Sequence, residues 1–374
     1  MPNIALYDLV FKGGGAKGMA FAGALQAFTD AGYKHRRVVG TSAGAITAML
    51  TGAGYSPKEL TDACTEKDAN GNPVFATFMD SPVESDFSKE LIDGCETLAL
   101  MKQAGFPFSG MLKDVEERMI ETLLHLRLYR ELFSFVECGG FYAGDAALNW
   151  IRQRLEQRGM AAGITWADFA AKTGSDVSVV ATDETAKESV VLNARTAPKV
   201  PVAESVRMSM SIPFVWREMT WEPEWGTYHL LRPDGTITEK VKAGNKFVDG
   251  GVLSNFPLRL IAEADDDVVA VMGRTDPNVA GNLGLFLDST IKLPGAEQSD
   301  TRLPELKVAR RVTQLIDTLT DSADLAVMEK YESYVCRLPV GGFGTTEFRM
   351  SADRQKLLIG SGTAAMKKFL KLPN

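Results

Sequence analysis

The chain has 374 residues, 45% of them hydrophobic and 24% charged, so it can bury a sizeable core in one large domain or two ordinary ones. Its formal net charge of −7 lacks the basic footprint of a nucleic-acid-binding protein, and we expect no nucleic-acid partner. Its four cysteines have neither zinc-ligand nor disulfide spacing, which fits a reducing compartment. The N-terminus lacks a signal-peptide pattern, and the uncharged stretch over residues 38–55 is too weakly hydrophobic to span a membrane. We therefore expect a cytoplasmic protein, with a secreted effector as the alternative.

The predicted elements begin with a strand over residues 4–11, which is almost continuously apolar, as expected of a parallel strand covered on both faces. It leads into a glycine-rich loop, Lys12-Gly13-Gly14-Gly15-Ala16-Lys17-Gly18, and a helix from Met19 to about Ala31 follows. Successive glycines leave backbone N–H groups uncovered, so several can converge on one negatively charged oxygen. The loop therefore predicts an oxyanion-binding site after this strand.

The same loop partly fits two nucleotide-binding patterns. Gly13, Gly15 and Gly18 have the spacing of the dinucleotide-binding fingerprint, between a strand and a helix. That fingerprint requires an acidic residue near the end of the second strand, and the strand predicted over residues 37–40 has none there. A Walker A loop requires a Lys-Ser or Lys-Thr pair after its last glycine, which is also missing. A nicotinamide-dependent oxidoreductase therefore ranks behind the two interpretations given below.

A sharp turn follows the second strand at Gly40-Thr41-Ser42-Ala43-Gly44. This Gly-x-Ser-x-Gly pattern is typical of a nucleophile elbow, in which a serine occupies a strained strand-to-helix turn and small flanking residues avoid clashes. The helix predicted over residues 43–54 would direct its positive N-terminal end at negative charge that develops on a substrate. The pattern predicts that Ser42 is a catalytic nucleophile.

A third motif, Asp249-Gly250-Gly251, follows the first two in the order and spacing of a known family. With these motifs the sequence resembles the patatin-like phospholipases over residues 4–70, 139–275 and 351–371. Lys17 stands where plant patatins carry Arg, as is common in bacterial members. The resemblance implies a catalytic dyad of Ser42 and Asp249. It also implies an oxyanion hole at Gly13, Gly14 and Gly15. The supporting motif positions that it implies are Lys17, Gly18, Gly40, Gly44, Gly250 and Gly251.

The fold implied by the resemblance is α/β, with a mostly parallel central sheet and helices on both faces, in a single catalytic domain over residues 1–374. Residues 70–138 do not match the family and are expected to form a helical insertion or lid, and residues 278–374 a C-terminal helical extension. The other predicted helices cover residues 145–158, 165–173, part of 205–214, 307–331 and 351–370. Strands are predicted over residues 177–182 and over residues 268–272, after the charged run Asp265-Asp266-Asp267. Residues 278–306 are predicted to be loop-rich.

The insertion has two interpretations. Helical spacing over residues 90–101 and 112–132 favours a helical insertion that packs its own small core. The alternative is a lid or interfacial surface that covers the serine and opens on lipid or on a partner. Aromatic and methionine side chains gather near its loops: Phe75, Phe78, Met79, Phe87, Phe106 and Phe108.

Histidine is scarce, and a Ser–Asp dyad needs none. His35 is expected in a charged loop, His125 on an insertion helix and His229 in a hairpin, and all three are interpreted as structural or solvated. A Ser–His–Asp arrangement of the α/β-hydrolase type requires a histidine late in the chain, and none follows His229. No metal or cofactor is expected.

The function implied by the resemblance is hydrolysis of fatty acyl esters, of phospholipids or lysophospholipids, by a serine ester hydrolase of the phospholipase A type. Asp249 would accept the Ser42 proton during attack on the ester carbonyl, and would then activate water against the acyl-serine. The implied partners are an acyl-lipid substrate, a transient membrane surface and, as for injected bacterial effectors of the family, a protein activator. The rival interpretation is a catalytically silent or partner-activated membrane- or protein-binding module of the same fold.

Overall fold

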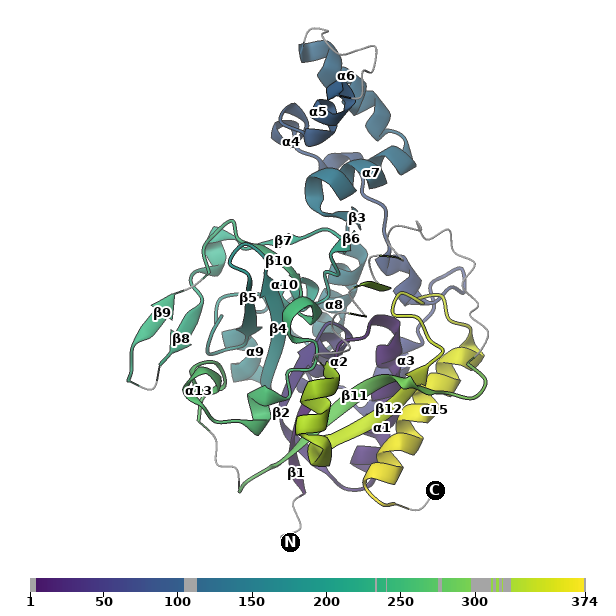
Figure 1. Ribbon diagram of the computed structural model, residues 1–374, viewed down its shortest axis with the longest axis vertical. Helices are drawn as coiled ribbons and strands as arrows, with labels where there is room; N and C mark the ends of the chain where they lie inside the picture. Colours follow the sequence, from purple (N-terminus) through teal and green to yellow (C-terminus); the bar gives the residue numbers. More distant parts are fainter. Residues whose placement is uncertain are drawn as a thin grey trace.

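The computed structural model describes residues 5–103, 113–232, 234–239, 241–274, 278–296 and 324–372, together with residues 311, 314, 315 and 318. Within this part of the chain, an eight-stranded sheet has the order β12-β11-β1-β2-β4-β10-β7, and β5 pairs with β4 (Figure 1). The strands are β1 (Leu6–Phe11), β2 (Lys34–Thr41), β4 (Asp176–Asp183), β5 (Glu188–Leu192), β7 (Met219–Thr220), β10 (Lys246–Asp249), β11 (Gly281–Lys292) and β12 (Val335–Gly341). The first five in this order are parallel, while β5, β7 and β10 pair antiparallel, so the expected mostly parallel sheet is confirmed.

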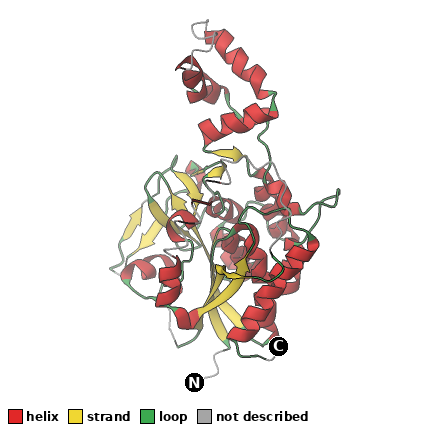
Figure 2. Cartoon of the chain, turned by 45° about the vertical axis from the view of Figure 1, so that its right-hand side comes forward, coloured by secondary structure: helices red, strands yellow, loops and turns green. Residues whose placement is uncertain are grey.

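Helices flank this sheet, as predicted (Figure 2). Helix α1 (Ala20–Asp30) connects β1 to β2, and α2 (Ala43–Gly52) lies on the connection from β2 to β4. Both connections are right-handed crossovers that move along the sheet in the same direction, so both helices lie on the same face of the sheet. That face also holds α3 (Pro57–Cys64), α10 (Val202–Ser209) and α15 (Ala352–Phe369), which contact α1 or α2. Helix α8 (Asp145–Gln157) packs against α10. The return from β10 to β11 runs in the opposite direction, through α11 (Gly251–Ser254), α12 (Arg259–Ala262) and α13 (Asp266–Met272).

Four helices stand away from the body and form what we call the tower (Figure 1). They are α4 (Lys89–Asp93), α5 (Glu96–Gln103), α6 (Lys113–Leu124) and α7 (Arg127–Cys138). At the base of the tower, β3 (Gly140–Tyr142) pairs in parallel with β6 (Phe214–Trp216). The tower has a small core of its own, made of Phe87, Ile92, Cys95, Ile120, Leu124 and Phe133. Phe75 and Phe78, which precede the tower within residues 70–138, belong instead to the main core.

The C-terminal part is not only helical, contrary to expectation. Residues 278–306 were expected to be loop-rich, but β11 inserts beside β1 and β12 pairs with β11 inside the main sheet. The six residues Leu283–Asp288 are all buried, so this strand lacks the alternation of a half-exposed strand and gives no periodic signal. The last helix, α15, has the predicted bounds and is capped by the Ser351 hydroxyl.

Three local predictions are wrong. Residues 268–272 form the end of helix α13 and not a strand, because Asp265 caps this helix by accepting N–H groups of its first turn. His35 lies on β2 and not in a loop, and His125 lies in the turn between α6 and α7. Most of the helix predicted over residues 307–331 falls outside the described residues, as do Phe106 and Phe108.

Other local predictions are confirmed. Helix α8 begins at Asp145, and α9 (Trp166–Thr173) is capped by Thr165. His229 starts a hairpin of β8 (His229–Leu231) and β9 (Ile237–Glu239).

Candidate active site

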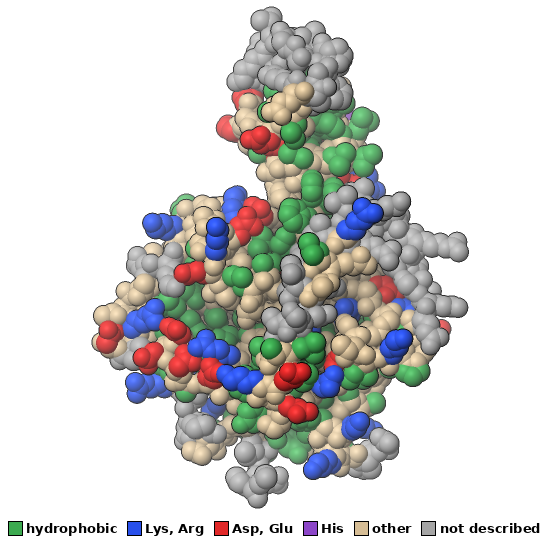
Figure 3. Space-filling model, viewed as in Figure 1, with side chains coloured by type: hydrophobic (Ala, Val, Ile, Leu, Met, Phe, Trp, Pro, Cys, Tyr) green, Lys and Arg blue, Asp and Glu red, His purple; other side chains and the backbone are tan. Residues whose placement is uncertain are grey.

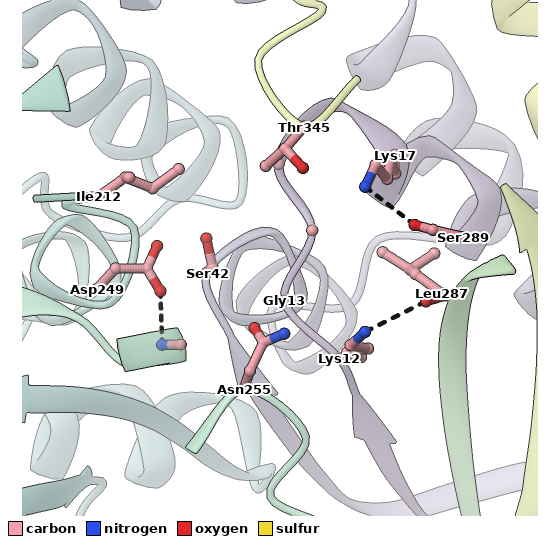
Figure 4. A pocket seen from close by; sticks show the side chains of 13 residues that line it. Lys12, Gly13, Lys17, Ser42, Ile212, Asp249, Asn255, Leu287, Ser289 and Thr345 are labelled. Carbon is pink, nitrogen blue, oxygen red and sulfur yellow. Dashed lines mark hydrogen bonds between the residues drawn. The ribbon is translucent and has the colours of Figure 1, made fainter. Parts of the chain in front are cut away.

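The glycine-rich loop and the Ser42 turn meet at one edge of the sheet, because both follow the carboxyl ends of neighbouring parallel strands, β1 and β2. A pocket opens between them and the turn after β10 (Figure 4). Its lining brings together the predicted residues Gly13, Gly14, Gly15, Lys17, Ser42, Asp249 and Gly251, with Lys12, Ile212, Asn255, Leu287, Ser289 and Thr345.

Ser42 occupies a strained turn between β2 and α2. Its φ of 55° and ψ of −120° are unusual for a residue with a side chain, and the residue is 5% exposed. The neighbouring Gly44 is required there, because a Cβ atom on it would lie 2.2 Å from the Phe11 carbonyl oxygen. The Ser42 N–H donates to Ser209 Oγ at 2.9 Å, and Ser209 Oγ donates to the Val180 carbonyl at 2.6 Å. Helix α10 therefore holds the strained turn against the sheet.

Asp249 ends β10 and presents its carboxylate beside the Ser42 hydroxyl (Figure 4). The side chain is buried, and its Oδ1 accepts the Gly251 N–H at 2.7 Å. Its backbone N–H donates to the Ser211 carbonyl at 2.8 Å, so the residue is fixed at both ends. The two predicted dyad residues, which are far apart in the sequence, are thus brought into one pocket.

The glycine loop offers two uncommitted amides. The Gly13 N–H donates to the Asn255 carbonyl at 2.9 Å, which ties the loop to the segment after Asp249. Among the described residues, no acceptor is found for the N–H groups of Gly14 and Gly15. Gly15 has a φ of +55°, and a Cβ on it would lie 2.1 Å from the Thr345 carbonyl oxygen. The loop therefore fits an oxyanion at Gly14 and Gly15 better than at Gly13.

Two buried lysines flank this loop. Lys12 Nζ lies 3.3 Å from Asp324 Oδ2 and 4.3 Å from the centre of the Phe286 ring. Lys17 Nζ donates to Ser289 Oγ at 3.1 Å. Both lysines line the pocket, the Asp249 carboxylate lines it too, and Asp324 pairs with Lys12, so the pocket holds charged groups of both signs.

A second, largely apolar pocket adjoins the first and shares Gly15, Ser42 and Ile212 with it. Phe75 and Phe78 from the 3-10 turn Val74–Phe78 line it together with Trp216. Trp216 Nε1 donates to the Phe78 carbonyl at 2.7 Å, which closes this wall. The remaining lining residues are Gly18, Met19, Ala43, Ile46, Thr47, Cys64, Met210 and Phe348.

The other glycines of the three motifs lie in a turn or at the ends of strands. Gly18 lies in the 3-10 turn that begins at Gly15, and Gly40 and Gly250 lie at the ends of β2 and β10. The three histidines are absent from the linings of both pockets. In the described part of the chain, no cluster of three or more His, Cys, Asp or Glu side chains could hold a metal ion.

Several site residues carry no motif and were missed. Ser209 anchors the elbow, Asn255 joins the loop to the Asp249 turn, and Leu287, Ser289 and Thr345 supply one wall. The fully buried Arg207 holds α10 in place by donating to three carbonyl groups, those of Ala143, Gly144 and Arg217.

Comparison with known proteins gives the family. The family model of patatin-like phospholipases matches residues 9–262, well over half of the chain, and this range includes Ser42, Asp249 and the glycine loop. The chain belongs to the patatin-like phospholipase family. Membership supports a lipid hydrolase in general. A curated relative of this patatin-like chain, "Uncharacterized protein YqhO" of Bacillus subtilis (strain 168), is 27% identical over 378 residues, covering 97% of the chain and 98% of the relative, and is consistent with a bacterial origin.

Two solved structures are also similar to this patatin-like chain. VipD from Legionella pneumophila is 15% identical with a TM-score of 0.45, over 99% of this chain and 67% of VipD. The type III effector ExoU is 17% identical with a TM-score of 0.41, over 99% of this chain, which spans about half of ExoU (53%). These likenesses are too distant to carry a functional conclusion.

Among the helices that the structure describes, none combines the length and the apolar character that a membrane-spanning segment requires.

Proposed function

We propose that this patatin-like chain hydrolyses fatty acyl esters of phospholipids or lysophospholipids, with Ser42 as nucleophile and Asp249 as base. The observation that carries the proposal is the position of Ser42 at the junction of two pockets. One is polar and contains Asp249 and the uncommitted amides of Gly14 and Gly15, and the other is apolar. An acyl ester needs both environments, because its carbonyl develops charge while its chain avoids water.

The reaction proceeds in two halves. Asp249 accepts the Ser42 Oγ proton as this oxygen attacks the ester carbonyl carbon, and the N–H groups of Gly14 and Gly15 stabilise the oxyanion. The intermediate collapses to an acyl-serine, and the leaving alcohol takes the proton from Asp249. A water molecule then gives a proton to Asp249 and attacks the acyl carbonyl. The fatty acid leaves and Ser42 recovers its proton.

A carboxylate is a weaker base than imidazole, since its ordinary pKa lies about two units lower. The oxyanion donors must therefore supply more of the rate than in a serine–histidine enzyme. In other enzymes, removal of one oxyanion-hole donor lowers the turnover rate by about 10²–10³-fold. In this chain the donors are backbone groups, so only changes of backbone shape can remove them.

The two pockets assign the parts of the substrate. The acyl chain occupies the apolar pocket, whose lining includes Phe75, Phe78 and Trp216. The rest of the lipid occupies the polar pocket, whose lining includes the ammonium group of Lys17. Phospholipids and lysophospholipids carry a phosphate close to the scissile ester, and such a cation can bind a phosphate.

The test is release of free fatty acid from mixed phospholipid vesicles by wild type, Ser42→Ala and Asp249→Asn, with and without a eukaryotic cell extract. Release that is lost in both variants supports the dyad, and dependence on the extract indicates a protein activator. If wild type releases nothing but a fluorophosphonate labels Ser42, the serine is active and the substrate assignment is wrong. If neither release nor labelling occurs, a catalytically silent binding module becomes the better proposal.

A further inference from the structure

Helix α7 of the tower exposes one apolar stripe. Leu128, Leu132 and Val136 recur at every fourth residue and are 59%, 44% and 41% exposed. The opposite side of α7 carries Phe133, which is buried in the core of the tower. Because that core already holds the tower helices together, folding of the tower does not require the exposed stripe to be apolar.

The stripe continues onto the body at Phe214. This residue is 44% exposed and has a φ of +66°, which is uncommon for an aromatic residue. Its N–H donates to the Gly139 carbonyl directly after α7. Phe135 of α7 bridges the two elements, since its ring lies 5.8 Å from the Phe214 ring and stacks on Phe141 at 4.4 Å. We call Leu128, Leu132, Val136 and Phe214 the α7 patch.

The α7 patch leads to the apolar pocket. Phe214 lies two residues from Ile212 on one side and from Trp216 on the other, and both of these line the pocket that contains Ser42. In the face shown in Figure 3, hydrophobic side chains gather on the tower and continue towards the body. Phe214 therefore joins the α7 patch to a chain segment that lines the apolar pocket.

The charged side chains of α7 are engaged within the tower. Arg127 pairs with Glu131 at 2.9 Å, and Arg130 donates to the carbonyl groups of Pro82, Leu124 and His125. Glu137 accepts the N–H groups of Glu96 and Thr97 at the start of α5. The patch itself is uncharged, so its partner is recognised by apolar contact and not by charge.

We propose that the α7 patch inserts into the surface of a lipid bilayer and holds the pocket mouth against it. The inference rests on the proposed function, because only a lipid substrate makes continuity between this patch and the acyl pocket useful. An acyl chain can then pass from the bilayer along Phe214 to Ser42 with little exposure to water. Binding depends on the interfacial burial of Leu128, Leu132, Val136 and Phe214 and is insensitive to salt.

The test is flotation of the full chain with phosphatidylcholine vesicles, in a Ser42→Ala background so that no lipid is hydrolysed. Leu132→Glu and Val136→Glu are each expected to lower the partition constant at least about tenfold, because each places a charge in the lipid interface. The control is Ile237→Glu on β9, which changes a more exposed apolar residue (61%) outside the patch and should bind as the parent does. Raising the salt concentration from 0.05 to about 0.5 M should change parent binding less than twofold.

The same substitutions in the active chain separate docking from catalysis. Hydrolysis of a water-soluble short-chain ester should stay within about twofold of wild type, while hydrolysis of vesicles should fall with the partition constant. The inference is overturned if the Ser42→Ala chain does not float, if all three glutamate variants bind alike, or if Leu132→Glu converts a dimer into a monomer. If flotation behaves as expected but wild type cleaves no ester, the proposed function fails and the docking surface stands.

Discussion

Replacement of Ser209 with alanine tests whether the strained turn at Ser42 depends on one hydroxyl group. Ser209 Oγ accepts the Ser42 N–H at 2.9 Å and donates to the Val180 carbonyl at 2.6 Å, in a fully buried position. Alanine removes both hydrogen bonds, and because it is smaller than serine it adds no clash. The variant therefore isolates the anchor of the elbow.

The expected magnitude follows from the two lost bonds. A buried N–H without an acceptor costs about 1–3 kcal/mol, and loss of the second bond adds about 1 kcal/mol, so the free energy of unfolding should fall by about 2–4 kcal/mol. The positive φ of Ser42 is itself unfavourable by about 1–2 kcal/mol, so the turn relaxes once its anchor is gone. A shift of the nucleophile by about 1 Å costs about hundredfold in rate, and we expect fluorophosphonate labelling to slow by about tenfold to hundredfold.

The matched control is Ser205→Ala on the same helix. Ser205 is also fully buried and also makes two hydrogen bonds, with Trp166 Nε1 at 2.8 Å and the Pro201 carbonyl at 3.0 Å, but it does not contact the elbow. Urea unfolding should show comparable losses of stability in both variants, whereas only Ser209→Ala should label slowly. Equal labelling rates in the two variants would refute the anchoring role.

Three further predictions concern the loop, the α10 support and the half-buried Cys64 thiol. Gly15→Ala should lower ester hydrolysis at least about hundredfold, because its Cβ would meet the Thr345 carbonyl at 2.1 Å, whereas Gly163→Ala, with open space around it, should retain activity. Arg207→Met should lower the free energy of unfolding in urea by about 3–5 kcal/mol, because three carbonyl groups lose their donor, and an unchanged urea midpoint would contradict this. Burial raises the pKa of the Cys64 thiol to about 12, so above about pH 9 the unfolded chain loses this proton before the folded chain does. Stability should therefore fall as the pH rises from about 9, and iodoacetamide should modify Cys64 at pH 9 only in urea; modification of the folded chain would show that the thiol is accessible.

The parts of the site that could be predicted are those whose chemistry is local. The turn at Ser42 requires particular residue types at fixed spacing, since Gly44 cannot carry a side chain and the serine must occupy a strained position. The glycine loop is recognisable for the same reason. Which of its amides remain available could not be predicted, because the Gly13 N–H is taken by the Asn255 carbonyl, more than 200 residues away.

The missed features depend on long-range packing. A serine within a helix has no pattern that marks it as an anchor, so Ser209 is indistinguishable in sequence from Ser205. The strand β11 was interpreted as a loop because it is buried on both faces and is interrupted by Gly284, Asp288 and Ser289. The helix α13 was interpreted as a strand because its five apolar residues are too few to show helical periodicity.

The insertion of β11 beside β1 also sets the order in which the molecule can be completed. Leu9 of β1 pairs with Leu283 of β11, which is synthesised 274 residues later. Strand β1 can therefore form this pairing only after β11 has been made. At about 5–20 residues per second on the ribosome, that interval is about 14–55 s. During this time one edge of β1 has no strand partner, and the wall of the glycine loop formed by Leu287 and Ser289 has not been made. The nascent chain therefore carries Ser42 well before it can assemble the pocket around this residue, which is complete only after Leu287, Ser289 and Thr345 have been synthesised.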